Sequence, residues 1–169
     1  MYKDFSNVER AFAPENAPVF KTNIPYITVD NFPTLGKLTA LRFIEWVSQN
    51  PEGVISLPTG KTPEYFIEWV KKILKDWDTP DGEKMRLECG LNVDKKPSLA
   101  DLRFVQIDEF YPIDPSQHNS FCNYVKKYYI DGFGMIYDKA QFIDCSQIPL
   151  WGGRSYKEIF PDGVIDLGL

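Results

Sequence analysis

Between positions 54 and 77 the chain runs from a short apolar segment through a turn into an amphipathic segment, and few folds accommodate that order. Residues 54–57 are nearly all apolar, which is typical of a strand buried on both faces of a parallel sheet. Residues 58–62 contain Pro and Gly and interrupt the strand. Apolar side chains then recur at helical spacing as far as Trp77, with Thr62 as the expected N-cap. This order predicts an α/β fold.

The same alternation of strand and helix recurs along the chain. Strands are predicted at 26–29, 54–57, 103–107 and 141–144, and helices at 33–49, 63–77 and 119–130, the last ended by Gly132. Residues 1–25 are predicted to form an irregular arm, and 78–101 and 146–163 to form loops. We therefore expect an α/β fold of three layers, αβα, with a mostly parallel, open, Rossmann-like sheet.

Composition and charge narrow the classes of function. The chain has 169 residues, which suits one domain, and a net charge of −5, which argues against a nucleic-acid surface. Its 12 Phe, 4 Trp and 9 Tyr residues exclude a disordered chain. No apolar run approaches the roughly 20 residues of a membrane helix, and the N-terminus lacks the pattern of a signal peptide. We expect a cytoplasmic globular protein that has neither nucleic acid nor membrane as a partner.

The three cysteines and the single histidine offer little metal or thiol chemistry. Cys89, Cys122 and Cys145 are spaced for neither a disulfide framework nor a zinc knuckle, so we expect half-buried small hydrophobes. His118 is the one histidine, which makes a site of several histidines impossible, and we expect it to hydrogen-bond within its loop. No metal site is predicted.

The first motif that can carry chemistry is Leu-Pro-Thr-Gly-Lys-Thr-Pro at 57–63. A strand end, a Gly turn and a helix start bring free backbone N–H groups and the positive helix end to one place, and the Thr hydroxyls add donors. A phosphate is the natural guest, and an ordinary capped helix start is the equal alternative. Gly60, Lys61 and Thr62 also resemble the end of a nucleotide-binding P-loop, but that motif needs a Gly where this chain has Ile55.

The second motif is the acidic pair Asp108 and Glu109, which follows the predicted strand at 103–107. Adjacent residues of an extended chain point in roughly opposite directions, so one carboxylate can face a cleft while the other faces a neighbouring element. A carboxylate beside a bound sugar can act as a general base on a C–H next to a carbonyl. A solvated loop or a helix cap is the alternative. Before the next helix, Asn119 or Ser120 is expected to be the N-cap.

In this order, these segments resemble the glucosamine-6-phosphate deaminase/isomerase family. The family has Leu-Pro-Thr-Gly-x-Thr-Pro where this chain has residues 57–63, and an aliphatic residue, Asp-Glu and an aromatic where it has 107–110. Ser120 and Phe121 fit the Ser-Phe at which a family helix starts. The resemblance extends over about 26–144, and its two main motifs are specific as a pair.

The resemblance implies an enzyme that opens the ring of glucosamine 6-phosphate, moves a proton between C2 and C1 and, with water, releases ammonia to leave fructose 6-phosphate. Asp108 matches the proton-transferring aspartate of the family. The residues assigned to binding the small-molecule sugar phosphate are Thr59, Gly60, Lys61, Thr62 and Glu109. No cofactor is expected, and family members commonly form homo-oligomers.

The chain lacks the family's third motif, Asp-Gly-His followed by Glu, which supplies the ring-opening histidine. We therefore expect residues 26–169 to be the N-terminal portion of one such domain, with a fold incomplete at its C-terminal end and no activity alone. Two alternatives stay open. One is a 6-phosphogluconolactonase-like hydrolase, although that family usually has Arg in place of Phe110. The other is a sugar-phosphate-sensing domain that keeps the binding loop without the chemistry.

Overall fold

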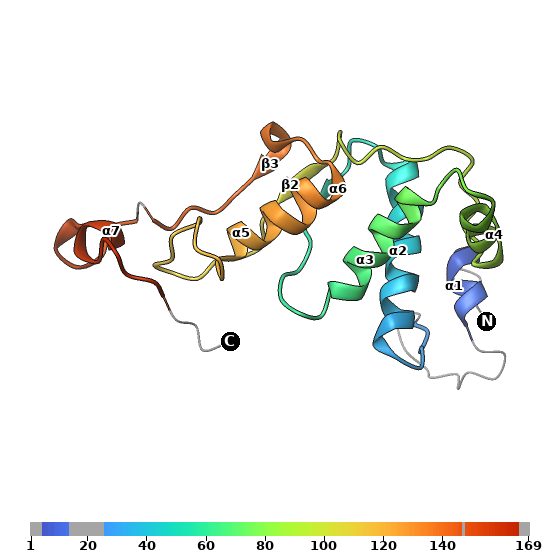
Figure 1. The fold of residues 1–169 in the computed structure, drawn as a ribbon, viewed down its shortest axis with the longest axis horizontal. Coiled ribbons are helices and arrows are strands. Elements are labelled where there is room, and N and C mark those ends of the chain that lie inside the picture. Colours follow the sequence, from blue (N-terminus) through green and yellow to red (C-terminus); the bar gives the residue numbers. More distant parts are fainter. Residues whose placement is uncertain (1–4, 14–25, 147, 166–169) are drawn as a thin grey trace. The chain divides into compact units, whose positions relative to one another are not determined.

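The computed structural model describes residues 5–13, 26–146 and 148–165, and the chain divides into two compact units. The helical unit comprises Met1–Pro51 and Gly60–Ser98, and the sheet unit comprises Glu52–Thr59 and Leu99–Leu169. Figure 1 shows the elements of both units in chain order.

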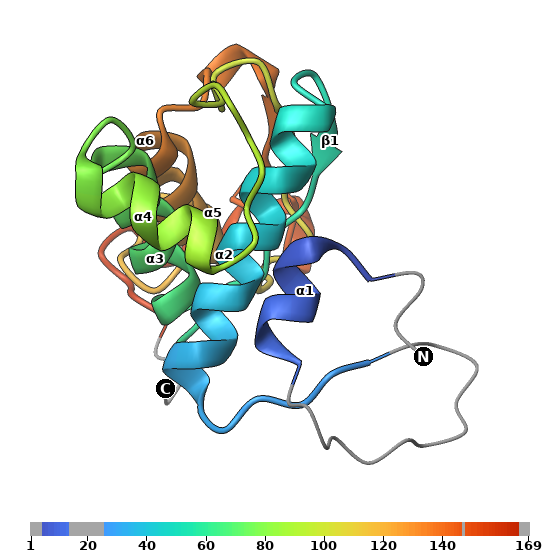
Figure 2. The same cartoon turned by 90° about the vertical axis from the view of Figure 1, so that its right-hand side faces the viewer.

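The helical unit is built on one long helix. Its described elements are α1 (Asn7–Phe12), α2 (Phe32–Gln49), α3 (Glu64–Lys75) and α4 (Pro80–Glu88). The side chain of Asn31 caps α2 by accepting a hydrogen bond of 2.9 Å from the backbone N–H of Thr34. Helix α1 lies beside α2 (Figure 2), where Glu9 and Arg42 form an ion pair of 3.1 Å.

Helices α2 and α3 lie side by side and supply most of the core of the helical unit (Figure 1). Phe43 and Phe66 meet edge to face with their ring centroids 5.5 Å apart. Gly36 allows the backbones to approach closely, because a Cβ atom added there would lie 2.4 Å from Cβ of Tyr65. The absence of a side chain at Gly36 therefore sets the spacing of the two helices.

The sheet unit contains a parallel sheet with the strand order β1-β2-β3. Its described elements are β1 (Val54–Ile55), β2 (Arg103–Val105), α5 (Phe121–Val125), the π-helical turn η1 (Lys126–Ile130), α6 (Asp131–Phe133), η2 (Tyr137–Lys139), β3 (Ala140–Gln141), η3 (Trp151–Gly153) and α7 (Tyr156–Ile159). In the register of the sheet, Ile55 and Ala140 both lie opposite Phe104. The α/β fold and the parallel, open sheet that we predicted are therefore confirmed, with strands shorter than expected.

One face of the sheet packs against the helical segment that starts with α5. Phe104 and Tyr129 are fully buried, and their ring centroids lie 6.0 Å apart. Side chains on the opposite face are exposed: Val54 is 63% exposed, Val105 39% and Ile107 57%. The prediction that the strand at 54–57 is buried on both faces is therefore wrong, because successive side chains point to opposite faces and Val54 is exposed on one of them.

Some segments that were predicted as irregular form short helices. Helix α1 lies within the predicted arm, and residues 14–25 of that arm lie outside the described residues. Helix α4 lies within 78–101, where Thr79 accepts a hydrogen bond from the N–H of Gly82 and Pro80 occupies the first helical position. Helices η3 and α7 lie within 146–163, and α7 begins with a capping box. Side-chain caps rather than apolar periodicity start α1, α4 and α7, and the prediction relied on periodicity.

Three local predictions are wrong. Residues 26–29 form no strand, because no neighbouring segment within the described chain offers them a ladder of hydrogen bonds. Pro63, not Thr62, is the N-cap of α3, and no side chain caps it. The helical segment from α5 passes Gly132 and ends at Gly134, whose φ of 71° is the left-handed conformation that stops a helix.

The contact at Gly36 predicts a loss of stability when a methyl group is added. Alanine at an exposed helical glycine would stabilise the helix by up to about 1 kcal/mol. At this position we expect Gly36→Ala to lower the free energy of unfolding by about 2 kcal/mol instead, because α2 and α3 are forced apart. Urea unfolding followed by circular dichroism measures the change. The control Thr39→Ala, on the exposed side of α2, should stay within about 0.5 kcal/mol, and an equal effect of both variants would contradict the close-approach argument.

Candidate active site

Asp108 lies at the carboxyl end of β2, the middle strand of the sheet. Its side chain is exposed, and its backbone carbonyl accepts a hydrogen bond of 2.8 Å from Nε2 of Gln106. Gln106 is only 4% exposed, and its Oε1 accepts a bond of 3.0 Å from the backbone N–H of Ile143, just beyond β3. The Gln106 side chain therefore ties the segment that carries Asp108 to the neighbouring strand.

Glu109 turns away from Asp108 toward the start of α5, as the divergence of adjacent acids predicts. Its carboxylate accepts hydrogen bonds from the hydroxyl of Ser120 at 2.7 Å and from the backbone N–H groups of Phe121 and Cys122 at 3.0 and 2.7 Å. The first N–H groups of a helix have no partners within it, and a negative charge suits the positive helix end. Glu109 therefore anchors α5 to the end of β2.

The loop at 57–63 is divided between the two units. Thr59 belongs to the sheet unit, and its neighbour Pro58 offers its carbonyl to the hydroxyl of the buried Tyr129. Burial raises the pKa of Tyr129, so its hydroxyl stays protonated and remains a donor. Because β1 and β2 are parallel neighbours, Thr59 and Asp108 both follow the same edge of the sheet.

Gly60, Lys61 and Thr62 belong to the helical unit, where they lead into α3. Gly60 has a φ of 89°, a conformation that suits glycine. The carbonyl of Lys61 accepts a bond of 3.2 Å from the N–H of Glu64, which closes the turn. All three residues are exposed. The loop therefore offers an exposed ammonium and an exposed hydroxyl immediately before a helix.

Beyond Glu109, the chain from 110 to 119 is held by the C-terminal part of the sheet unit. The hydroxyl of Tyr111 donates to the carbonyl of Pro149 at 2.9 Å. Asp114 and Lys157 form an ion pair, and the pair lowers the pKa of Asp114 to about 2, with help from a hydrogen bond of Ser116. The segment after Asp108 and Glu109 is thus fixed at points far apart in the sequence.

The rest of the same stretch leads into α5. The side-chain amide of Gln117 exchanges two hydrogen bonds with the backbone of Ile165, at 2.8 and 3.1 Å. His118 is exposed in this loop. Ser120 caps α5 through a bond of 3.3 Å from the N–H of Asn123, which confirms one of the two predicted caps.

The cysteines are placed for packing rather than reactivity. Cys89, Cys122 and Cys145 are free and buried. Burial raises the pKa of Cys122 and of Cys145, which keeps both as neutral thiols. Among the described residues, no group of three His, Cys, Asp or Glu side chains is arranged to hold a metal ion. None of the helices described is long and apolar enough to cross a membrane.

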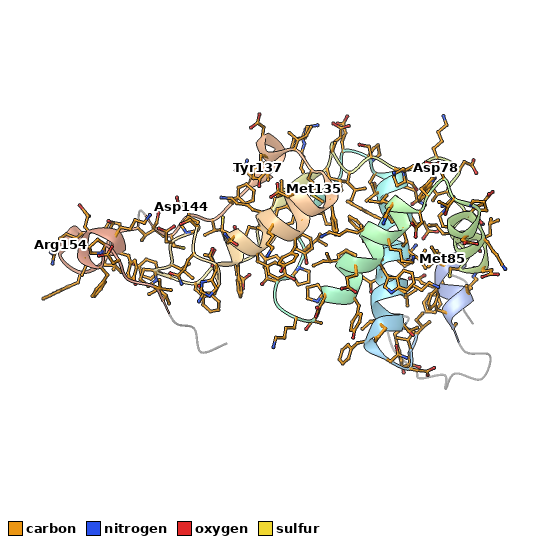
Figure 3. The ribbon with its side chains drawn as sticks, viewed as in Figure 1. Asp78, Met85, Met135, Tyr137, Asp144 and Arg154 are labelled. Carbon is orange, nitrogen blue, oxygen red and sulfur yellow. The ribbon has the colours of Figure 1, made fainter. Side chains whose placement is uncertain are left out.

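Sequence reasoning missed two polar residues at this edge of the sheet. Gln106 interrupts an otherwise apolar strand, and a polar residue at a buried strand position is the signal that could have identified it. Asp144 follows β3 and lies beyond its end (Figure 3). Its carboxylate accepts bonds of 2.9 and 2.6 Å from the N–H and hydroxyl of Ser146, which close a turn. The carboxyl edge thus carries Asp108 and two acids engaged in local structure, Glu109 and Asp144.

Comparison with known proteins gives a likeness of fold. No protein-family model matches the sequence, and no curated protein matches it either. Among solved structures, the chain is similar to a monomeric glucosamine-6-phosphate deaminase, which is described as a missing link of the NagB superfamily. The TM-score is 0.54 at 16% sequence identity, over 69% of this chain and 41% of the deaminase. The chain thus shares an α/β fold with that structure over the matched part and spans less than half of its length.

The ion pair of Asp114 predicts a pH-dependent contribution to stability. The folded pKa of about 2 lies below the ordinary value of 3.8, so the contribution is complete above pH 4 and is lost as the pH falls toward 2. We expect Lys157→Ala to lower the free energy of unfolding at pH 7 by about 1 kcal/mol, since Lys157 is largely exposed.

Carbon-13 NMR titration of the Asp114 carboxyl checks the cause directly. Its pKa should rise from about 2 toward 3.8 in Lys157→Ala. The control Lys84→Ala, which removes an exposed ion pair with Glu88, should leave the Asp114 titration unchanged. An unaltered Asp114 pKa in Lys157→Ala would show that the ion pair is not what lowers it.

Proposed function

We propose that the protein is a glucosamine-6-phosphate deaminase, which converts glucosamine 6-phosphate and water into fructose 6-phosphate and ammonia. The observation that carries the proposal is the exposed Asp108 carboxylate at the carboxyl end of the middle strand of a parallel sheet, where α/β folds bind ligands. The likeness in fold to a solved deaminase supports it. Phosphorylated sugars are metabolites of the cytoplasm, and we infer that the enzyme acts there.

Asp108 is the proposed general base. In the open-chain sugar the C2–H bond lies next to the C1 carbonyl, which stabilises negative charge when the proton leaves. The carboxylate removes the C2 proton and returns it to C1, while the C2 nitrogen loses one proton and O1 gains one, which leaves an imine at C2 and regenerates the carboxylate. Water then replaces nitrogen at C2, and ammonia leaves. No metal or organic cofactor takes part in this scheme.

The loop at 59–62 is the proposed anchor of the phosphate. Lys61 supplies a positive charge, and Thr59 and Thr62 supply hydroxyl donors. Gly60 lets the backbone turn with a positive φ so that its N–H groups can face an anion.

Phe110 supports a deaminase over a lactonase. Its ring packs on Phe121, the first residue of α5, with the centroids 4.7 Å apart. The residue that follows Asp-Glu is therefore part of an apolar contact, whereas an arginine there would serve to hold an acidic substrate.

The role of Asp108 is tested by Asp108→Asn. The amide is nearly the same shape but cannot take a proton, so we expect kcat for ammonia release to fall at least about 100-fold. Binding of glucosamine 6-phosphate, measured by calorimetry, should change little. The control Asp138→Asn, an exposed aspartate at η2, should keep the wild-type rate.

Three results would overturn the proposal, each in a different direction. Wild-type turnover in Asp108→Asn would show that Asp108 is not the general base. Hydrolysis of 6-phosphogluconolactone by the wild-type protein, without ammonia release from the amino sugar, would favour the lactonase. Saturable binding of glucosamine 6-phosphate without any turnover would favour a sensing domain.

The anchor is tested by Lys61→Ala. Loss of one charge-assisted contact should raise the Kd for glucosamine 6-phosphate about tenfold, with a smaller effect at high salt. Glucosamine without phosphate should bind wild type and variant alike. Lys75→Ala, in the last turn of α3, is the matched control. An unchanged Kd in Lys61→Ala would place the phosphate elsewhere.

A further inference from the structure

We propose that Glu109 is a positioning residue, which holds the Asp108 carboxylate in its working place and makes no contact with the substrate. This inference rests on the proposed function, in which Asp108 is the base. It replaces the binding role that the sequence suggested for Glu109.

The carboxylate of Glu109 is saturated by the protein itself. Oε1 accepts bonds of 3.0 Å from the backbone N–H groups of Phe110 and Phe121. Oε2 accepts bonds of 2.7 Å from the Ser120 hydroxyl and from the N–H of Cys122. A carboxylate offers about four lone-pair sites. With these four donors in place, and a fifth, longer bond of 3.4 Å from Nε2 of Gln106 to Oε2, no acceptor site remains for a sugar hydroxyl.

The same carboxylate is coupled to the backbone of Asp108. Nε2 of Gln106 donates to the carbonyl of Asp108 at 2.8 Å and approaches Oε2 of Glu109 at 3.4 Å. Gln106 is also fixed at its other end by the N–H of Ile143. Asp108 is therefore held from the preceding side by Gln106 and from the following side by Glu109, while its own side chain stays exposed.

Only a carboxylate can accept all of these hydrogen bonds. Each of its oxygens faces at least one backbone N–H, and a carboxylate consists of acceptors alone. A glutamine would direct its NH₂ group at two backbone N–H groups in the place of Oε1, or at the N–H of Cys122 in the place of Oε2, so at least one bond would be lost. Ser120 is fully buried and has no water to replace the missing acceptor. The end of β2 and the start of α5 would then separate, and Asp108 would move with them.

The experiment compares Glu109→Gln with wild type in ammonia release from glucosamine 6-phosphate. A displacement of about 1 Å in a catalytic group costs about 100-fold, so we expect kcat to fall about 100-fold while KM stays within about twofold. Ser120→Ala removes one of the four donors and guards against a Glu109→Gln variant that fails to fold. It should lower kcat about tenfold, again without raising KM.

Matched controls come from α7 in the same unit. Glu158 accepts a bond of 2.7 Å from the N–H of Ser155, whose hydroxyl caps the helix in return. Glu158→Gln and Ser155→Ala therefore make the same chemical changes at another helix start, and both should keep the wild-type kcat. A KM that rises with kcat unchanged in Glu109→Gln would mean that Glu109 binds substrate. An unchanged kcat and KM with a lowered Tm would mean that it only stabilises the fold.

Amide hydrogen exchange separates this inference from the proposed function. In Glu109→Gln, exchange at Phe110, Phe121 and Cys122 should accelerate at least about tenfold, because these N–H groups lose their acceptors. If the full-length wild-type protein releases no ammonia, the proposed function fails, and exchange alone then decides whether Glu109 holds these three amides. Unchanged exchange at these amides would overturn the inference whatever the activity.

Discussion

Strand β2 is the element on which the sheet unit depends, because among the strands of the described residues it alone pairs on both sides. Its register with β1 and β3 brings together segments that are 49 and 36 residues away in the chain, as the pairs Val54–Arg103 and Phe104–Ala140 show. The buried ring of Phe104 packs on Tyr129 from this strand. Parallel pairing also determines where a ligand can bind, because it brings the carboxyl ends of the strands to one edge of the sheet.

At that edge the structure separates two kinds of acid. Asp108 is exposed and can reach a ligand, whereas the carboxylate oxygens of Glu109 accept hydrogen bonds that join the end of β2 to α5. In the proposed function, the exposed carboxylate of Asp108 is the base, and the hydrogen bonds of its neighbours hold the backbone that carries it. Tyr129 extends the support to the loop after β1 through its bond to Pro58.

The fold class could be predicted because hydrophobic patterning is local. The apolar run before 58–62 and the amphipathic helix after it indicated a strand and helix of the α/β kind, and both exist as β1 and α3. Hydrophobic patterning failed for helices that start from a side-chain cap and for a segment that needs a neighbouring strand. Helix α4 has little apolar periodicity and begins after its N-cap, Thr79. Residues 26–29 have side chains typical of a strand, but the described residues offer them no neighbouring strand.

The sequence alone determined that Asp108 and Glu109 follow a strand and that their side chains point in opposite directions, because adjacent side chains of an extended chain do so. It could not assign their roles. Only the tertiary structure brings Ser120 and Cys122, eleven and thirteen residues later, against Glu109, and only the sheet brings Ile143 against Gln106. Hydrogen bonds between distant segments depend on register and packing, which no short stretch of sequence encodes.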